Sequence, residues 1–458
     1  MQRVAGSFRD PSGYVFEHDG VLYRAVMERF REDFEAFVDS GCHAALVDAG
    51  LLVDHDDLAD TSLAPEAWKI LRPERVPFLT WPHEWSPGQR RAAAIATLDA
   101  QLIALEHDLV LRDASAFNVQ FVKGRPILID TLSFGRRVED APWTAYGQFC
   151  RHFLAPLALE AHVDPRLAAL LLGNIDGIPL DLAAGLLPGK TKRRPGLAMH
   201  LHLHARATAT READPDAEPK TARFSRKALV GMAQQLRGAV GKLSWEPRGT
   251  VWVDYYDEAG HYDEAAMDAK VALVRRHLES LAPDLVFDLG ANTGRFSQLA
   301  AGTGATVVAA DIDHGAVEGA WRAIQERPLD VGDLIPIRYD LANPTPRIGW
   351  GNEERADLAD RGPADVILAL ALVHHLAIGN NVPLTAVLEV FARLGRSAVV
   401  EWVPKDDPKV RVLLATREDI FDGYTQEAFE DAAAAHFQIA QRDPVGDSGR
   451  ILYLLHPA

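Results

Sequence analysis

Two apolar runs that each end in an acid, with a glycine turn and a helix pattern between them, restrict the fold of this chain more than any other part of it. The first run, residues 285–289, contains Asp288 and leads to Gly290 and Gly294; the second, residues 306–310, leads to Asp311. Glycines let the backbone approach a ligand closely, and an acid about twenty residues further on can hold a ribose diol. The stretch therefore predicts a strand, a glycine loop, a helix and a second strand around a nucleotide-like ligand.

The rest of the C-terminal half continues this alternation. Strands are predicted at residues 285–289, 306–310, 335–339, 366–372, 397–403, 437–442 and 451–456, after a helix over residues 263–281. Alternating strands and helices favour a parallel, doubly wound sheet that binds its ligand at the carboxyl ends of the strands. The predicted fold class of this half is therefore α/β.

Residues 286–296 and 309–313 resemble motif I and the following acidic motif of class I S-adenosylmethionine-dependent methyltransferases. The resemblance implies a Rossmann-like methyltransferase domain over residues 251–458, an antiparallel hairpin at the sheet edge, and S-adenosyl-L-methionine as cofactor. It places the amino-acid end of the cofactor at Asp288 and the glycine loop, the ribose at Asp311 and the adenine at Asp340. The cofactor-binding residues that it implies are Tyr256, Asp288, Gly290, Asn292, Gly294, Asp311, Ile312, Asp340, Leu341 and Ala369.

A nicotinamide dinucleotide site is the alternative interpretation of the glycine loop. A dehydrogenase fingerprint has three spaced glycines, and the middle position in this chain is Asn292. With Asp340 and the histidines described next at family-like places, methyl transfer is favoured over hydride transfer.

His374 and His375 follow the predicted strand at residues 366–372 and are the candidate catalytic residues. In this topology they lie over the methyl donor, where an imidazole can accept a proton from the acceptor. Many methyltransferases carry His-His-Leu here without using a base, because alignment of the acceptor with the sulfonium supplies much of the rate. Glu401 is expected on an acceptor-binding rim, and Trp350, Glu354 and Arg355 in a lid or an acceptor contact. The expected acceptor is a small molecule, a glycan or a peptide.

Residues 111–131 carry a second motif, with Asp113 and Asn118 before two short predicted strands and Asp130 after them. This arrangement resembles the catalytic loop and metal-binding acid of protein kinases and aminoglycoside-phosphotransferase-like kinases. By that resemblance Asp113 orients or deprotonates an acceptor hydroxyl, while Asn118 and Asp130 hold magnesium against the phosphates. The strand that should carry the phosphate-pairing lysine offers Arg24 instead, so Arg24, Asp113, Asn118 and Asp130 form a candidate nucleotide site for Mg-ATP.

No glycine-rich phosphate loop precedes this motif, so the resemblance implies an N-terminal α+β degenerate kinase-like domain over residues 1–189. Three alternatives stay open: a binding scaffold or pseudokinase, an active phosphotransferase, and an unrelated fold with a coincidental motif. Residues 190–250 are polar and contain several prolines, which predicts a linker. The whole chain resembles bacterial nodulation-protein-like methyltransferases.

Composition narrows the partners and the compartment. A formal net charge of −17 argues against general affinity for nucleic acid or an anionic membrane, because phosphate contacts need clustered Lys and Arg. Cys42 and Cys150, the two cysteines, match no metal or redox spacing and indicate a reducing compartment. No metal site is predicted. No apolar stretch has the length of a signal peptide core or a membrane span, so a soluble, cytoplasmic protein is expected.

Overall fold

The computed structural model describes residues 2–213, 223–247, 264–415 and 417–458. The chain forms two compact units. Unit 1 comprises Met1–Glu246 with Arg347–Arg355, and unit 2 comprises Pro247–Pro346 with Ala356–Ala458. Segment 347–355 thus belongs to unit 1, although the chain on either side of it belongs to unit 2.

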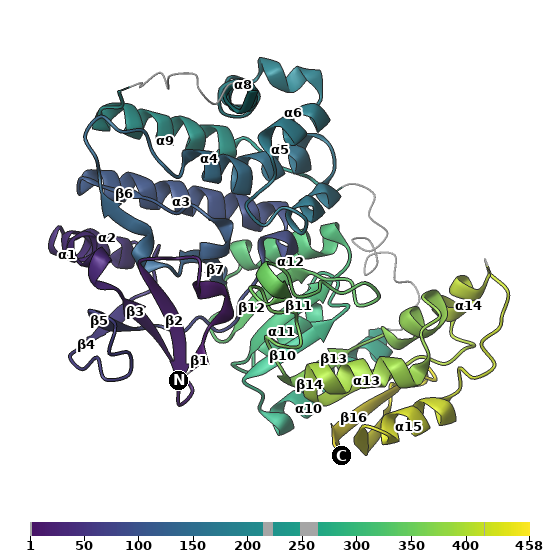
Figure 1. The fold of residues 1–458 in the computed structure, drawn as a ribbon. Helices are drawn as coiled ribbons and strands as arrows, with labels where there is room; N and C mark the ends of the chain where they lie inside the picture. Colours follow the sequence, from purple (N-terminus) through teal and green to yellow (C-terminus); the bar gives the residue numbers. More distant parts are fainter. Residues whose placement is uncertain (1, 214–222, 248–263, 416) are drawn as a thin grey trace. The chain divides into compact units, whose positions relative to one another are not determined.

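Unit 2 is built on a seven-stranded sheet of order β12-β11-β10-β13-β14-β16-β15 (Figure 1). Its strands are β10 (Leu285–Leu289), β11 (Thr306–Asp311), β12 (Asp333–Arg338), β13 (Ala364–Ala369), β14 (Gly395–Trp402), β15 (Phe437–Pro444) and β16 (Ile451–Pro457). Neighbours from β12 to β14 pair in parallel, whereas β16 pairs antiparallel with both β14 and β15. The predicted α/β class, the doubly wound sheet and its antiparallel edge hairpin are confirmed.

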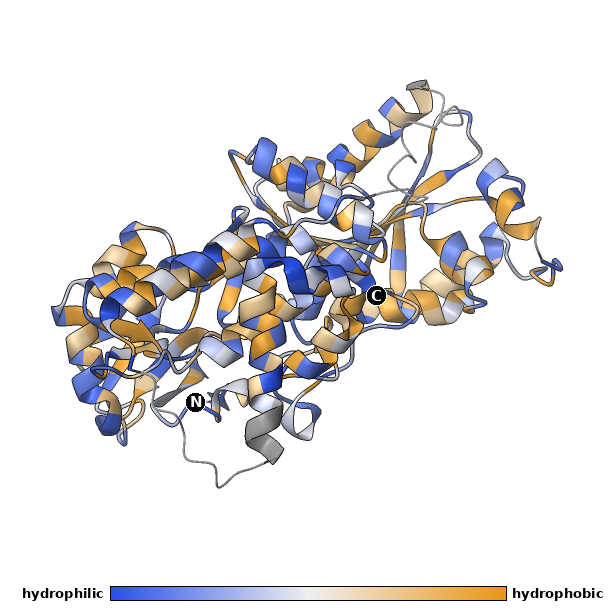
Figure 2. Ribbon diagram, turned by 90° about the horizontal axis from the view of Figure 1, so that it is seen from above, coloured by the Kyte–Doolittle hydropathy of each residue, from blue (hydrophilic) through white to orange (hydrophobic). Residues whose placement is uncertain are grey.

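Helices pack on both faces of this sheet, because its parallel strands are buried on both faces. They are α10 (Glu264–Leu281), α11 (Arg295–Ala301), α12 (His314–Glu326), α13 (Leu384–Leu394), α14 (Pro408–Leu414) and α15 (Gln426–Ala434). Val274, Phe296 and Ile324, from the first three helices, join one buried cluster with residues of the sheet. Val387 and Phe391 of α13 are buried as well, and α13 contacts β13 and β14. Figure 2 shows the resulting runs of hydrophobic residues along strands and helices.

Unit 1 opens with a five-stranded antiparallel sheet of order β1-β2-β3-β5-β4. The strands of this unit are β1 (Gln2–Arg3), β2 (Gly13–His18), β3 (Val21–Val26), β4 (His55–Leu58), β5 (Lys69–Pro73), β6 (Leu109–Leu111), β7 (Val119–Val122), β8 (Arg125–Leu128) and β9 (Phe134–Arg136). Its helices are α1 (Arg31–Asp39), α2 (Cys42–Asp48), α3 (Pro87–Glu106), α4 (Tyr146–Phe149), α5 (Ala155–His162), α6 (Leu180–Leu186), α7 (Pro195–Leu197), α8 (His204–Ala213) and α9 (Arg226–Gly241). Helix α3 begins in a capping box, in which the Ser86 hydroxyl accepts from Gln89 N and the Gln89 side chain accepts from Ser86 N.

The linker predicted over residues 190–250 was wrong for the described part of that range. Helices α7, α8 and α9 lie within it, and α9 packs along α3. Leu229, Ala233, Leu236 and Val240 recur at helical spacing on α9 and are buried. The basic stretch at 190–194 and the Pro-rich stretch at 215–220 dominated the composition of this range, so the apolar stripe that packs α9 in unit 1 was overlooked.

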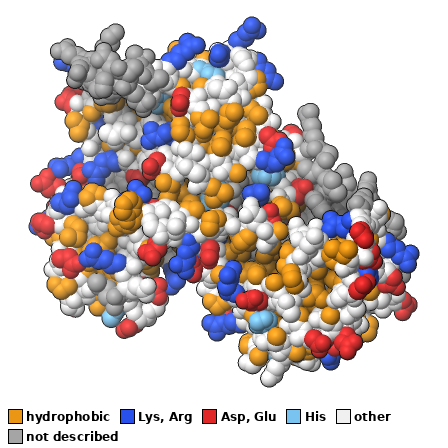
Figure 3. Space-filling view, turned by 45° about the vertical axis from the view of Figure 1, so that its right-hand side comes forward, with side chains coloured by type: hydrophobic (Ala, Val, Ile, Leu, Met, Phe, Trp, Pro, Cys, Tyr) orange, Lys and Arg blue, Asp and Glu red, His pale blue; other side chains and the backbone are white. Residues whose placement is uncertain are grey.

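On the face shown in Figure 3, Lys and Arg side chains are interspersed with Asp and Glu. Of the helices in the described part of the chain, none combines the length and apolar character that a membrane crossing requires.

Candidate active site

A cavity of about 380 Å³ lies in unit 2 at the carboxyl ends of the parallel strands. The residues that line it are Met267, Lys270, Asp288, Gly290, Ala291, Asn292, Phe296, Asp311, Ile312, Tyr339, Asp340, Leu341, Ala342, Leu370, Ala371, Leu372, His375, Leu376, Gly379, Asn380, Leu413 and Arg417. They come from the ends of β10 and β11 and the residues after them, from the segments that follow β12 and β13, and from α10, α11, α14 and the segment after α14. Parallel strands bring residues far apart in sequence to one edge of the sheet, which is where such folds bind ligands.

The glycine loop after β10 has the backbone that a close ligand requires. Gly290 and Gly294 have φ values of +74° and +85°, in the left-handed region that favours glycine, and Asn292 also has a positive φ of +52°. A Cβ atom added at Gly290 would lie 3.2 Å from Leu372 Cδ1. Glycine therefore keeps this wall of the cavity open to a ligand.

Three acids stand at successive strand ends along the cavity. Ser297 Oγ donates to Asp288 Oδ2 at 2.5 Å, and burial raises the pKa of Asp288 to about 6. Asp311 accepts from the backbone N of Asn292 and of Asp313, each at 2.8 Å, and burial raises its pKa as well. Asp340 accepts from Ala342 N at 2.9 Å. Backbone donors thus fix two of the carboxylates in place beside the cavity.

The structure brings together most of the residues that the sequence singled out for the cofactor. Asp288, Gly290, Asn292, Asp311, Ile312, Asp340 and Leu341 all line the cavity. Gly294 does not line the cavity and is the residue before α11. Ala369 is buried at the end of β13. In place of Ala369, the next three residues, 370–372, form the wall. Tyr256 lies outside the described residues.

The two adjacent histidines have different positions. His375 lines the cavity, whereas His374 is 1% exposed and is absent from the residues that line it. Their ring centroids are 4.2 Å apart. Burial is the main cause that lowers the pKa of both, to about 4 for His375, so both rings are neutral at neutral pH. The prediction that both face the methyl donor is therefore corrected: His375 alone of the pair faces the cavity.

Replacing His375 with glutamine tests its buried, neutral state. The pKa of His375 is about 4 in the folded protein and 6.5 for the free side chain, so between these values the unfolded chain binds more protons. The contribution of His375 to the free energy of unfolding therefore decreases as the pH falls from about 6.5 to about 4. We expect the free energy of unfolding to fall by roughly 1 kcal/mol more per pH unit in the wild type than in His375→Gln. Urea unfolding at pH 7, 6 and 5 measures both slopes, and equal slopes would contradict the assignment.

The expectation for Glu401 is wrong. Glu401 is fully buried and pairs with Lys270 Nζ at 2.6 Å, so it forms no acceptor-binding rim.

Glu354 and Arg355, expected in a lid or an acceptor contact, belong to unit 1. There Arg9 Nε donates to Glu354 Oε1 at 2.7 Å, and the Arg355 guanidinium lies 4.5 Å from the centroid of the Phe117 ring.

Sequence reasoning missed Lys270, a cation in the cavity wall. A signal was present, because Met267, Lys270, Val274 and Leu278 follow helical spacing on α10 and are all buried. A lysine within the apolar stripe of an amphipathic helix is unusual unless its charge is paired. The helical spacing by itself therefore indicates that Lys270 is a buried, paired charge.

In unit 1 the four residues of the candidate nucleotide site also come together. Arg24 Nη2 lies 2.8 Å from Asp130 Oδ1 and 2.7 Å from Asp10 Oδ2. Ser133 Oγ donates to Asp130 Oδ2 at 2.7 Å, and Asn118 Nδ2 donates to that hydroxyl at 3.4 Å. Gln148 Nε2 donates to Asp113 Oδ1 at 2.7 Å, while burial and the charge of Asp130 raise the pKa of Asp113. An arginine therefore pairs with the acid that the kinase resemblance assigns to magnesium.

The sheet order and the cavity define the class of protein: unit 2 has a Rossmann-like methyltransferase fold with its ligand cavity at the carboxyl edge. No family model matches the chain. It is 34% identical over 461 residues to the nodulation protein NoeA of Rhizobium meliloti (strain 1021), with 98% of this chain and 95% of that protein aligned. The chain belongs to the family of NoeA.

Solved structures with a similar fold include two methyltransferases. One is magnesium protoporphyrin IX methyltransferase (ChlM) from Synechocystis PCC 6803 with bound SAH, at 18% identity and a TM-score of 0.32, covering 45% of this chain and 97% of that one. The other is the bifunctional kinase-methyltransferase WbdD, at 18% identity and a TM-score of 0.29, covering 44% of this chain and 42% of that one.

Proposed function

We propose that unit 2 transfers a methyl group from S-adenosyl-L-methionine to a small-molecule, glycan or peptide acceptor. The observation that carries this proposal is the row of acids, Asp288, Asp311 and Asp340, at successive strand ends along one cavity. S-adenosyl-L-methionine presents an ammonium, a ribose diol and an adenine amino group, and a carboxylate can accept a hydrogen bond from each. The residues present therefore fit this cofactor.

S-adenosyl-L-methionine would supply an electrophilic methyl group on its sulfonium. Residues 370–372 and His375, in the cavity wall, would orient the acceptor toward that methyl group, and such alignment supplies much of the rate. His375 is neutral at neutral pH, so a ring nitrogen can accept a hydrogen bond from an O–H or N–H acceptor; because burial lowers its pKa to about 4, the ring would orient the acceptor and act only as a weak base.

The test of this function has two stages. Calorimetry with the purified full chain and S-adenosylhomocysteine should detect binding. A lysate supplied with S-adenosyl-L-methionine labelled in its methyl group should then yield a labelled product that depends on the added protein. No heat of binding and no labelled product would overturn the proposal.

Asp288→Asn tests the acid at the amino-acid end of the cavity. Burial raises the pKa of Asp288 to about 6, so the carboxylate is charged above that pH and neutral below it. Only the charged form attracts an ammonium, and we expect the affinity for S-adenosylhomocysteine to fall about tenfold per pH unit below about pH 6. The affinity of Asp288→Asn should be lower at pH 8 and should not change between pH 8 and pH 5. Calorimetry over this range measures both, and a wild-type affinity that rises on acidification would contradict the assignment.

For unit 1 we propose recognition of the acceptor or of a partner. Support comes from the Arg24–Asp130 ion pair, which gives the metal-binding acid of the kinase resemblance a protein partner. The convergence of Asp113, Asn118 and Asp130 favours a second candidate, in which unit 1 binds Mg-ATP. It would then act either as a kinase at a saccharide end or as a nucleotide-sensing regulatory module.

Thermal unfolding of the full chain with and without Mg-ATP separates these alternatives. A raised melting temperature with release of ADP supports a kinase, and a raised temperature without turnover supports a nucleotide sensor. Asp130→Asn should abolish either effect. An unchanged melting temperature supports acceptor or partner recognition.

A further inference from the structure

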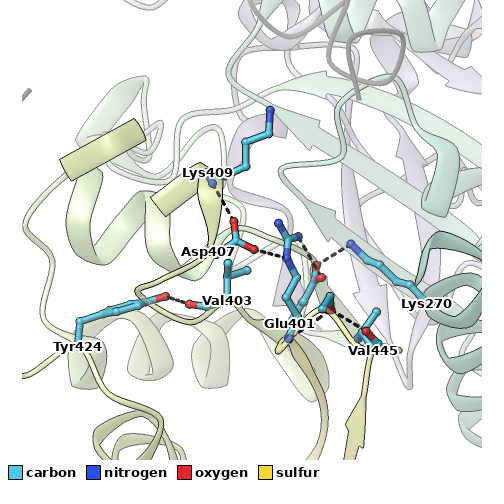
Figure 4. Close-up of polar contacts among 9 residues, drawn as sticks. Lys270, Glu401, Val403, Asp407, Lys409, Tyr424 and Val445 are labelled. Atoms are coloured by element: carbon cyan, nitrogen blue, oxygen red, sulfur yellow. Dashed lines mark hydrogen bonds and ion pairs between the residues drawn. The ribbon is translucent and has the colours of Figure 1, made fainter. Parts of the chain in front are cut away.

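Four buried charged side chains form a cluster in unit 2, and Figure 4 labels three of them, Lys270, Glu401 and Asp407. Lys270 Nζ lies 2.6 Å from Glu401 Oε2, and Arg450 Nη1 lies 3.4 Å from Glu401 Oε1. Arg450 Nε also donates to Asp407 Oδ2 at 2.8 Å. All four side chains are less than a tenth exposed, and they come from α10, the end of β14, the start of α14 and the segment before β16.

The stability of the fold does not by itself explain why these four charges are buried together. Two cations and two anions must lose their water, and well-packed apolar side chains often serve a fold as well as a buried ion pair does. One member, Lys270, also forms part of the cavity wall. Its ammonium interacts electrostatically with Asp288, and Nζ lies 4.8 Å from the centroid of the Phe296 ring. The cluster therefore presents a positive charge to whatever fills this end of the cavity.

The order of the strands indicates which part of a ligand meets Lys270. Strands β12, β11, β10, β13 and β14 follow one another across the sheet. Asp340 and Asp311 stand at β12 and β11, Asp288 at β10, and Lys270 is bonded to Glu401 of β14. A ligand that runs from adenine at Asp340 through ribose at Asp311 ends with its amino acid between Asp288 and Lys270.

An amino acid at that end is a zwitterion, with an ammonium and a carboxylate on one carbon atom. Asp288 offers the negative partner and Lys270 the positive one, so the pair is complementary to both charges. The other cation in the described lining is Arg417, whose guanidinium is instead hydrogen-bonded to the carbonyls of Ile378 and Gly379. Because an ammonium carries three N–H donors, one lysine can hold Glu401 and a ligand carboxylate together.

We propose that Lys270 binds the carboxylate of the cofactor's amino-acid end, and that Glu401, Arg450 and Asp407 position its ammonium. This inference rests on the proposed methyltransferase function. Glu401 pairs with Lys270 and so fixes the position of its ammonium. Arg450 in turn pairs with both Glu401 and Asp407. Lys270 then selects donors and products that carry a free carboxylate.

Three probes separate this role from a structural one: S-adenosylhomocysteine, its decarboxylated analogue, which keeps the ammonium, and 5′-methylthioadenosine, which lacks the whole amino acid. Calorimetry with the full-length wild type should show S-adenosylhomocysteine binding about ten- to a hundredfold more tightly than the decarboxylated analogue. In Lys270→Met this preference should shrink to about threefold or less, with the affinity for 5′-methylthioadenosine unchanged. Lys405→Met, which removes the partner of Asp419 at the surface, should keep the full preference.

The outcomes are distinguishable. If the wild type binds none of the probes, the methyltransferase function fails and this inference with it. If Lys270→Met keeps the preference, or loses affinity for all three probes alike, the carboxylate role of Lys270 is overturned while the function stands.

Glu401→Gln provides a second variant that does not depend on the folding of Lys270→Met. It leaves the ammonium in the wall without the carboxylate that positions it, so the preference for the carboxylate should fall to a value between those of the wild type and Lys270→Met, with the affinity for 5′-methylthioadenosine unchanged. An unchanged preference in Glu401→Gln would overturn the positioning role of Glu401.

Discussion

Asp311→Ala should bind S-adenosylhomocysteine about a hundredfold more weakly than the wild type, a loss of about 3 kcal/mol. The physical reason is that, in the proposed site, the Asp311 carboxylate accepts hydrogen bonds from both ribose hydroxyls, and hydrogen bonds to a charged group are the strong ones. The carboxylate already accepts two backbone N–H groups, from Asn292 and Asp313, which hold it beside the cavity. Calorimetry on the full-length variant measures the loss, after thermal unfolding has established that it is folded.

Asp313→Ala is the matched control, two residues away. The Asp313 carboxylate caps α12 by accepting from Gly315 N at 2.6 Å and Ala316 N at 3.0 Å. Its loss should reduce stability by about 1 kcal/mol and leave the affinity within about threefold. An unchanged affinity in Asp311→Ala, or an equal loss in both variants, would refute the ribose assignment.

Glu160→Ala should lower the free energy of unfolding of unit 1 by about 3–5 kcal/mol, because it leaves a buried guanidinium without its carboxylate. Arg90 Nε lies 3.1 Å from each Glu160 oxygen, and both side chains are at most 1% exposed. Arg90→Met combined with Glu160→Met removes both charges and should restore most of the loss. Urea unfolding followed by tryptophan fluorescence measures the change.

The same helix, α3, offers the control pair. Asp99 of α3 accepts from Arg237 Nε at 2.5 Å, but these two side chains are 32% and 48% exposed. Asp99→Ala should therefore cost less than about 1 kcal/mol, since solvent screens such a pair. If Glu160→Ala and Asp99→Ala lowered the free energy of unfolding by similar amounts, burial would not determine how much an ion pair contributes to stability.

Much of the unit 2 fold was predictable because its signals are local. The predicted strand at 285–289 coincides with β10, and all seven predicted strands overlap the observed ones. The residues of the glycine loop have the positive φ angles that glycine spacing indicated. The acids gather along one cavity because parallel strands place their carboxyl ends at a common edge.

The predictions failed where they relied on average polarity or on adjacency in the sequence, because neither describes how side chains pack. Residues 226–241 were included in a linker predicted from the polar composition of the range 190–250, yet they form α9 because one buried stripe packs against α3. The domain predicted over residues 251–458 included residues 347–355 because they are adjacent in sequence, whereas this segment folds with unit 1. Average composition carries no information about which face of a helix, or which unit, will bury a residue.

The sequence by itself determined the strand and helix order of unit 2, its glycine loop and the acids at its strand ends, since these follow from short-range periodicity and backbone freedom. Only the tertiary structure decided which of the adjacent His374 and His375 faces the cavity, and that Lys270 meets Glu401 across 131 residues of chain. It also decided that Arg24 pairs with Asp130 in unit 1. These are contacts between elements far apart in sequence, and their geometry depends on how helices and sheets pack.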